Sequence, residues 1–126
     1  MSNLFKIEGK DKIYNIIVSE QYQVAVNKEV LEKIKTILSN LKYSLLNGKQ
    51  YCSFVSLGYC QNTYTVTFEC SNIEVEPGKF QAYLQIRLSP IINVDDKIKN
   101  ITLSQHDIYI GILDSLIAEI NSIKED

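Results

Sequence analysis

The most regular alternation of apolar and polar positions runs from Phe80 to Leu88. Its apolar positions all fall on one side: Phe80, Ala82, Leu84, Ile86 and Leu88. The opposite side carries Gln81, Tyr83, Gln85 and Arg87. A period of two is typical of a strand with one buried face. The segment therefore predicts a half-buried strand whose polar face shows an aromatic ring and the only arginine of the chain.

Two segments change to the helical period. From Lys28, apolar residues recur at helical spacing as far as Leu45, with Asn27 as a suitable N-cap and Asn47-Gly48 as the end. The second helix is predicted over Ile108 to Ile123, with Ser104 as its N-cap and Asp107 closing a turn that resembles a capping box.

The apolar arc of the second helix is wider than a surface helix needs. Either a sheet covers this helix within one chain, or a second copy of the chain does, and the small size of the chain favours a homodimer. The predicted dimer interface comprises Ile108, Tyr109, Ile112, Leu113, Leu116 and Ile120.

The remaining segments are strand-like. A hairpin is predicted from Leu4–Glu8 and Ile13–Val18, followed by a strand at Tyr22–Val26. Later strands are predicted within Gln50–Cys70, with interruptions at Gly58 and at Gln61-Asn62, and at Ile101–Leu103. Ser71–Glu76 continues extended or as a loop, and Pro77-Gly78 occupies the centre of a predicted type II turn.

These elements predict an α+β fold: one or two antiparallel sheets of six to eight strands, one helix inserted after the third strand, and a C-terminal amphipathic helix. Residues 1–126 are expected to form a single domain. Both helices follow a short strand and a polar cap, so residues 1–48 and 49–126 form a candidate unequal repeat. The alternative is that any strand-to-helix junction has this appearance.

The composition indicates a folded chain whose small net charge produces no strong electrostatic field. Of the 126 residues, 45% are apolar and 22% charged, and the net charge is −2, so nucleic-acid binding would need a local basic patch. Neither a membrane-spanning run nor a secretory signal is recognised, so a cytoplasmic location is expected. Three cysteines at long spacings suggest no disulfide framework, and each is expected to be a small buried side chain.

Catalytic signals are weak throughout the chain. The single histidine, His106, has no partner at ligand spacing and is expected to be solvated in the first turn of the second helix. Asp95-Asp96 suits a hard metal ion, but adjacent acids in a loop are usually exposed charge. We therefore expect no enzyme, no metal and no cofactor.

The C-terminal third resembles a known kind of domain. Its features are the strand Tyr83–Pro90, a connection with Lys97 and Lys99, the segment Ile101–Ser104, and a helix. This order resembles the positive-cofactor-four type of transcriptional coactivator domain and the related Whirly proteins, which join two sheet-helix units in one chain. The resemblance implies single-stranded DNA binding on the sheet, with Arg87, Lys97 and Lys99 contacting phosphates.

Two functions follow from these observations. The first is non-enzymatic binding of single-stranded nucleic acid through Tyr83, Gln85, Arg87, Lys97 and Lys99, where Tyr83 offers a stacking surface by its outward position. Alternatively, Tyr83 and Arg87 form a cation–π pair that only covers the sheet. The second function is protein binding, for example as a small acidic viral or mobile-element inhibitor or adaptor that blocks a host protein.

Overall fold

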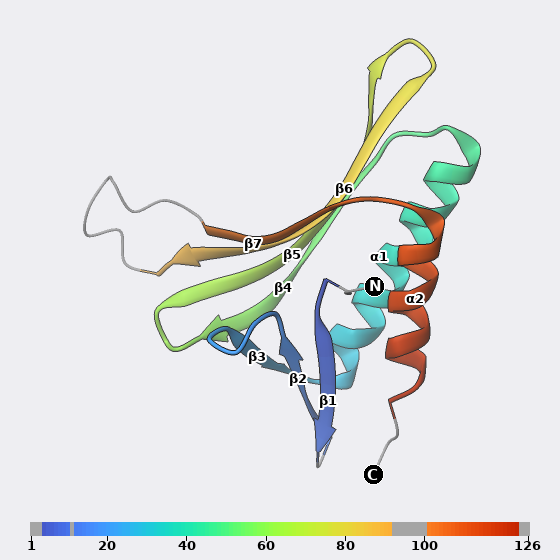
Figure 1. Ribbon diagram of the computed structural model, residues 1–126. Coiled ribbons are helices and arrows are strands. Elements are labelled where there is room, and N and C mark those ends of the chain that lie inside the picture. Colours follow the sequence, from blue (N-terminus) through green and yellow to red (C-terminus); the bar gives the residue numbers. More distant parts are fainter. Residues whose placement is uncertain (1–3, 11, 92–100, 124–126) are drawn as a thin grey trace.

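Two antiparallel sheets and two helices make up the fold (Figure 1). The computed structural model describes residues 4–10, 12–91 and 101–123. The predicted α+β class is confirmed, with one helix after the third strand and one at the C-terminal end. The elements are β1 (Lys6–Lys10), β2 (Ile13–Ile17), β3 (Gln23–Val26), α1 (Lys28–Asn47), β4 (Tyr51–Cys60), β5 (Tyr64–Glu76), β6 (Lys79–Pro90), β7 (Ile101–Asp107) and α2 (Ile110–Asn121).

The local signals around α1 are confirmed. The Asn27 side chain accepts a hydrogen bond from the Val30 amide at 3.0 Å, which satisfies one of the free amides of the first turn. Gly48 ends the helix in the left-handed conformation, with φ +59°, where a residue without a Cβ is favoured. Leu31, Ile34 and Leu38 are buried along one side of the helix, as their spacing predicted.

The four-stranded sheet has the order β4-β5-β6-β7. The predicted interruption at Gly58 is wrong, because β4 passes through this residue in a bulge. The predicted interruption at Gln61-Asn62 is confirmed, since β4 ends there and both residues take positive φ values. Ser71–Glu76 is strand rather than loop, and Gly78 turns the chain at φ +78° as a type II turn requires.

The β5–β6 hairpin is longer than its neighbours. β4 pairs with β5 only as far as Asn72, and β7 pairs with β6 only as far as Tyr83. Residues 73–81 therefore form a two-stranded arm that projects beyond the sheet, as Figure 1 shows. Ile73 and Val75 on this arm are 42% and 57% exposed.

The predicted start of the second helix is wrong. Ser104 and Asp107 lie in β7, which continues to Asp107 because every residue from Ser104 to Asp107 faces a partner on β6. α2 begins at Ile110 after Tyr109, whose side chain makes no capping hydrogen bond. His106 consequently lies in a strand opposite Leu84, half-buried, rather than solvated in a helical turn.

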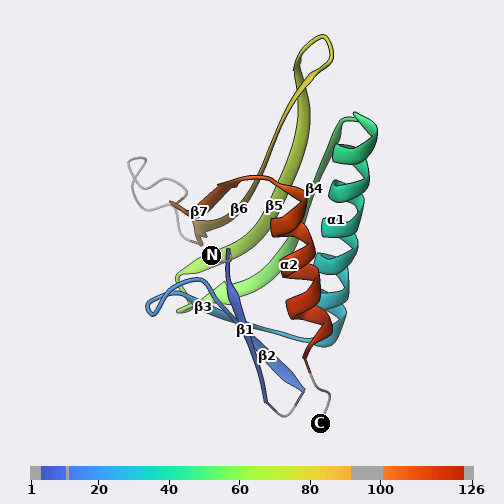
Figure 2. The ribbon, with the colours of Figure 1, turned by 45° about the vertical axis from the view of Figure 1, so that its right-hand side comes forward.

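α2 packs beside α1 on one side of the four-stranded sheet (Figure 2). Lys42 Nζ contacts Asp114 Oδ1 at 2.7 Å, and Lys35 Nζ donates a hydrogen bond to Asn121 Oδ1 at 2.9 Å across this helix pair. The Ile7 amide of β1 donates to Glu119 Oε1 at 3.3 Å. A neighbouring helix of the same chain thus covers part of the apolar arc of α2.

One hydrophobic core joins both sheets and both helices. The inner face of the four-stranded sheet supplies Phe68, Leu84 and Ile86, each fully buried. Phe5, just before β1, meets Phe68 edge-on with ring centroids 6.1 Å apart. All of this core lies on the helix side of the sheet, which leaves the opposite face of the sheet uncovered by the described elements (Figures 1 and 2).

Candidate binding face

The strand register arranges the uncovered side of the four-stranded sheet into three rows. We call these residues the outer face. The row nearest the arm is Cys52, Ser71, Tyr83 and Asp107. The middle row is Phe54, Glu69, Gln85 and Gln105. The last row is Ser56, Thr67, Arg87 and Thr102.

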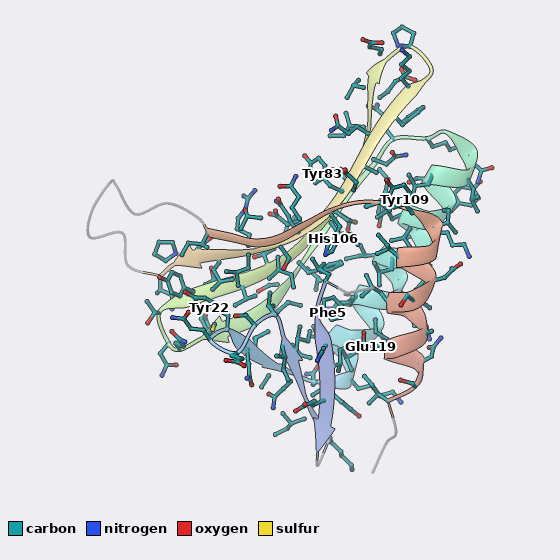
Figure 3. The ribbon with its side chains drawn as sticks, in the orientation of Figure 1. Phe5, Tyr22, Tyr83, His106, Tyr109 and Glu119 are labelled. Carbon is teal, nitrogen blue, oxygen red and sulfur yellow. The ribbon has the colours of Figure 1, made fainter. Side chains whose placement is uncertain are left out.

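Tyr83, Gln85 and Arg87 share this face, as the alternation along their strand predicted. Figure 3 shows Tyr83 and His106 on opposite sides of the sheet, with His106 toward the helices. Lys97 and Lys99, the other two predicted phosphate contacts, lie outside the described residues, as do Asp95 and Asp96.

Arg87 is held by an acidic neighbour on β5. Its Nη2 lies 3.3 Å from Glu69 Oε2, and the Gln85 amide donates a short hydrogen bond to the same oxygen. The Glu69 and Arg87 side chains are 26% and 37% exposed, so both are partly shielded from water. The guanidinium thus has an ion-pair partner in place, which a phosphate ligand would need to displace.

A shallow hollow of about 210 Å³ lies between the arm and this polar cluster. Phe54, Ile73 and Tyr83 line it together with Glu69, Gln85 and Arg87. Ser71 also lines it and is only 5% exposed. The hollow is smaller than the range of about 300–1,000 Å³ usual for small-molecule sites, so its size suits one inserted side chain.

Two polar atoms at this hollow lack a hydrogen-bond partner among the described residues. They are Ser71 Oγ and Arg87 Nε, both shielded from solvent. Buried polar groups are normally paired, and leaving one unpaired costs about 1–3 kcal/mol. A ligand group that forms a hydrogen bond with either atom would remove this cost. Such a bond would therefore contribute more binding free energy than a bond to an atom that is already hydrated.

The three cysteines divide between the two sides of the sheet. Cys60 and Cys70 are buried, as expected, but the expectation is wrong for Cys52, which is exposed on the outer face. Burial, with a smaller contribution from the neighbouring Cys52, raises the pKa of the Cys70 thiol to about 12. Cys70 therefore stays protonated and chemically inert while the protein is folded.

The residues of the predicted dimer interface differ in how deeply they are buried. Leu113, Leu116 and Ile120 are buried within the single chain, while Tyr109 is 69% exposed and Ile108 and Ile112 are half-buried. These three side chains belong to the hydrophobic core of the single chain. The homodimer stays a prediction, and light scattering at micromolar concentration would decide it.

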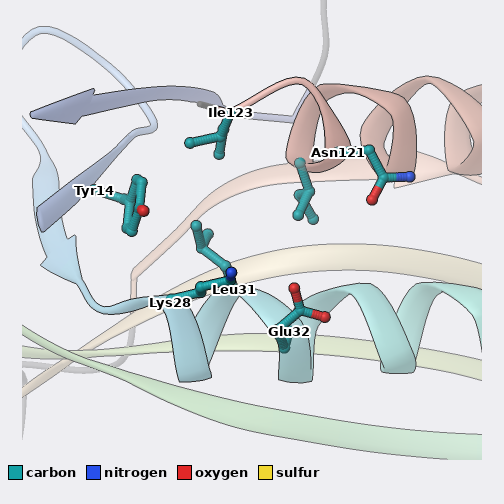
Figure 4. A pocket seen from close by; sticks show the side chains of 7 residues that line it. Tyr14, Lys28, Leu31, Glu32, Asn121 and Ile123 are labelled. Atoms are coloured by element: carbon teal, nitrogen blue, oxygen red, sulfur yellow. The ribbon is translucent and has the colours of Figure 1, made fainter. Parts of the chain in front are cut away.

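A second hollow lies at the ends of the two helices (Figure 4). Tyr14 of β2, Lys28 and Glu32 of α1, and Asn121 and Ile123 near the end of α2 line it, and it encloses about 150 Å³. That volume is well below the usual range of ligand sites. In the described part of the chain no group of three or more histidine, cysteine or acidic residues is placed to bind a metal ion.

Glu69, Ser71 and Phe54 were not among the predicted site residues. The alternation along β5 places Glu69 on the polar side with the threonines, but only the strand register brings it to Gln85 and Arg87. Phe54 is 70% exposed, although aromatic residues in strand segments usually indicate core.

Comparison of the chain with protein-family models, with curated proteins and with solved structures found no match. None of the described helices is both long and apolar enough to cross a membrane.

Proposed function

We propose that the protein is a non-enzymatic protein-recognition module that docks a partner on its outer face. One observation carries this proposal: Phe54 at 70% exposure and Ile73 at 42% exposure flank a hollow with the unpaired, buried Ser71 hydroxyl. Exposed aromatic and aliphatic side chains around a pocket are typical anchor points of protein interfaces. An inhibitor or adaptor acting on a host protein fits this mode of binding.

The charge on the outer face also supports a protein partner over nucleic acid. The described outer face has two carboxylates, Glu69 and Asp107, against one guanidinium, Arg87. Affinity for a nucleic acid comes mainly from basic side chains that neutralise phosphates. On this face the only described arginine is already paired with Glu69, so it contributes little to the neutralisation of phosphates.

Capture from a nuclease-treated lysate tests the proposal. We expect the immobilised wild-type protein to retain a stoichiometric protein partner. Ile73→Asp, which places a charge beside the hollow, should abolish retention because the incoming side chain would meet a carboxylate. Ile13→Asp is the matched control, since Ile13 on β2 is also exposed, at 56%, but lies away from the outer face.

Two outcomes would contradict the proposal. The first is that no protein is retained after nuclease treatment. The second is that Ile73→Asp retains the partner as well as Ile13→Asp does, because the outer face would then not be the docking surface.

A second candidate is single-stranded nucleic-acid binding, favoured by the alignment of Tyr83, Gln85 and Arg87 on one face of β6. It predicts that a labelled single-stranded oligonucleotide shows salt-sensitive binding by fluorescence anisotropy, and that Arg87→Ala reduces both affinity and the salt slope. Absence of binding at low salt, or an unchanged slope in Arg87→Ala, would exclude this candidate.

A further inference from the structure

The first half of β4 is an unprotected sheet edge. β4 pairs with β5 on one side, and within the described ranges no strand pairs with its other side. The strand Tyr51–Cys60 contains no charged residue and no proline, the usual means by which proteins block edge strands. Its second half is bulged at Gly58, where a Cβ would lie 3.6 Å from Val24 of β3. The stretch from Tyr51 to Ser56 instead borders an open groove, across which Asn40 of α1 donates a hydrogen bond to the Tyr51 hydroxyl at 3.5 Å.

A groove runs along this open edge, between it and α1. It encloses about 620 Å³, within the size range of functional binding sites. Its apolar lining includes Ile37 of α1 and Val55 of β4, which are 7% and 9% exposed. The remaining lining residues are Glu29, Glu32, Lys33, Thr36, Asn40, Tyr51, Ser53, Phe54 and Ser56.

The length of the groove matches a short extended peptide. From Glu29 to Asn40, α1 rises by about 17 Å at about 1.5 Å per residue. From Tyr51 to Ser56, β4 spans about 17 Å at about 3.3 Å per residue. An added strand of about six residues would therefore lie along both walls over their whole length.

The charge of the groove favours a basic occupant over an acidic one. Its lining holds two carboxylates, Glu29 and Glu32, and one ammonium, Lys33, which lies 3.6 Å from Glu29. Glu32 lies 3.8 Å from Lys35, which is outside the groove lining. These exposed ion pairs contribute little stability and are easily exchanged for a ligand cation. A lysine or arginine of the ligand can therefore pair with Glu29 or Glu32.

We infer that β4 takes up an extended segment of a partner protein as a fifth strand of the sheet. The partner backbone would bond to the open edge at Tyr51–Ser56, and alternate side chains would enter the groove against Ile37 and Val55. One basic residue would pair with Glu29 or Glu32. The side chains between them would stand beside Phe54, which lines both the groove and the outer-face hollow.

This inference rests on the proposed function, because it names the kind of partner segment that a protein-recognition module of this shape would hold. The groove and the outer face meet at Phe54, so one partner can occupy both. Ser53 also lines both hollows, but Glu32 and Thr36 line the groove alone of the two and Ile73 lines only the outer-face hollow, which allows the two to be tested apart.

Selection from a displayed library of random peptides of about twelve residues tests the groove. The whole protein is the bait. We expect enriched sequences with apolar residues at alternate positions, at least one lysine or arginine, and no proline within the paired stretch. Thr36→Arg, which fills the groove from the exposed side of α1, should weaken binding about tenfold or more, and Glu32→Lys should also weaken it.

Two variants serve as controls. Glu20→Lys makes the same charge change at an exposed site outside the groove and should leave peptide affinity unchanged. Ile73→Asp should also leave it unchanged, because Ile73 lines only the outer-face hollow. Enrichment of no sequence, or equal binding of the selected peptides to wild type and Thr36→Arg, would overturn the inference.

Amide hydrogen exchange separates strand addition from mere occupancy of the groove. Binding of a selected peptide should slow exchange of the outward amides within Tyr51–Ser56, and methylating alternate backbone nitrogens of the peptide should abolish binding. Binding without any change in exchange along β4 would contradict strand addition. Loss of partner capture by Ile73→Asp alongside such a failure would leave the proposed function intact and remove only this inference.

Discussion

At the scale of single residues, Glu69 is the charged group on which the outer face depends. It holds Arg87 at 3.3 Å and accepts a hydrogen bond from Gln85. Glu69→Ala would leave the half-buried guanidinium without its carboxylate, so we expect a loss of about 1–2 kcal/mol in unfolding free energy, measured by urea denaturation.

The control for this loss is Glu76→Ala. Glu76 pairs with Lys79 on the arm, where both side chains are at least 65% exposed, and its removal should change stability by less than about 0.5 kcal/mol. Equal effects of the two substitutions would show that Glu69 has no special role.

The cysteines give a pH-dependent prediction. Between about pH 9 and pH 12 the unfolded chain loses the Cys70 proton while the folded chain keeps it, because the folded pKa is raised to about 12. The contribution of Cys70 to stability is therefore complete below about pH 9 and is lost as the pH rises toward 12.

At about pH 8, alkylation followed by mass spectrometry should modify Cys52 alone in the folded protein and all three cysteines in denaturant. Rapid modification of Cys70 in the folded protein would be inconsistent with its burial.

At the scale of elements, the sequence predicted α1 and the first hairpin well because their signals are local. Asn27 and Gly48 act within one helical turn, and the same contacts appear in the structure. The start of α2 could not be read in this way. The Ser104–Asp107 pattern favours a helix locally, but pairing of these residues with β6 overrides it.

The contact of Glu69 with Gln85 and Arg87 on the outer face could not be predicted from the sequence either, because it depends on how β5 pairs with β6. A two-residue turn at Pro77-Gly78 with regular pairing would place Glu69 opposite Ile86, on the wrong side of the sheet. A register shift between Glu74 and Glu76 moves Glu69 opposite Gln85 instead. A shift of one residue in the pairing moves every side chain of a strand to the other face of the sheet. No pattern of residues in the sequence predicts this bulge.

The uncapped start of α2 yields a stability prediction. Tyr109 occupies the N-cap position with φ −117° and ψ 151°, an extended conformation that suits a capping aspartate. Tyr109→Asp would supply a side-chain acceptor and a negative charge at the positive end of the helix dipole. We expect thermal unfolding to show stabilisation of about 0.5–1 kcal/mol. A lower midpoint than wild type would indicate that the exposed Tyr109 ring makes contacts of its own, such as those of a dimer.

At the scale of the whole molecule, the helices, the three-stranded sheet and the core all lie on one side of the four-stranded sheet. This one-sided arrangement is what leaves an outer face with exposed apolar groups and an open edge at β4. The alternation in the sequence predicted that one side of the sheet would be polar. It did not predict that Phe54, Ile73 and Val75 would interrupt that polarity, because the exposure of a side chain depends on which elements pack above it.

The central claim is that the outer face becomes covered when a partner protein binds, and Cys52 is a natural reporter on that face. We would measure the rate of Cys52 alkylation in the free protein and in the captured complex, using an Ile13→Cys variant that carries a second exposed thiol away from the face. Strong slowing at Cys52 with an unchanged rate at position 13 is the expected result. Equal rates at Cys52 in the free and bound states would contradict docking on the outer face.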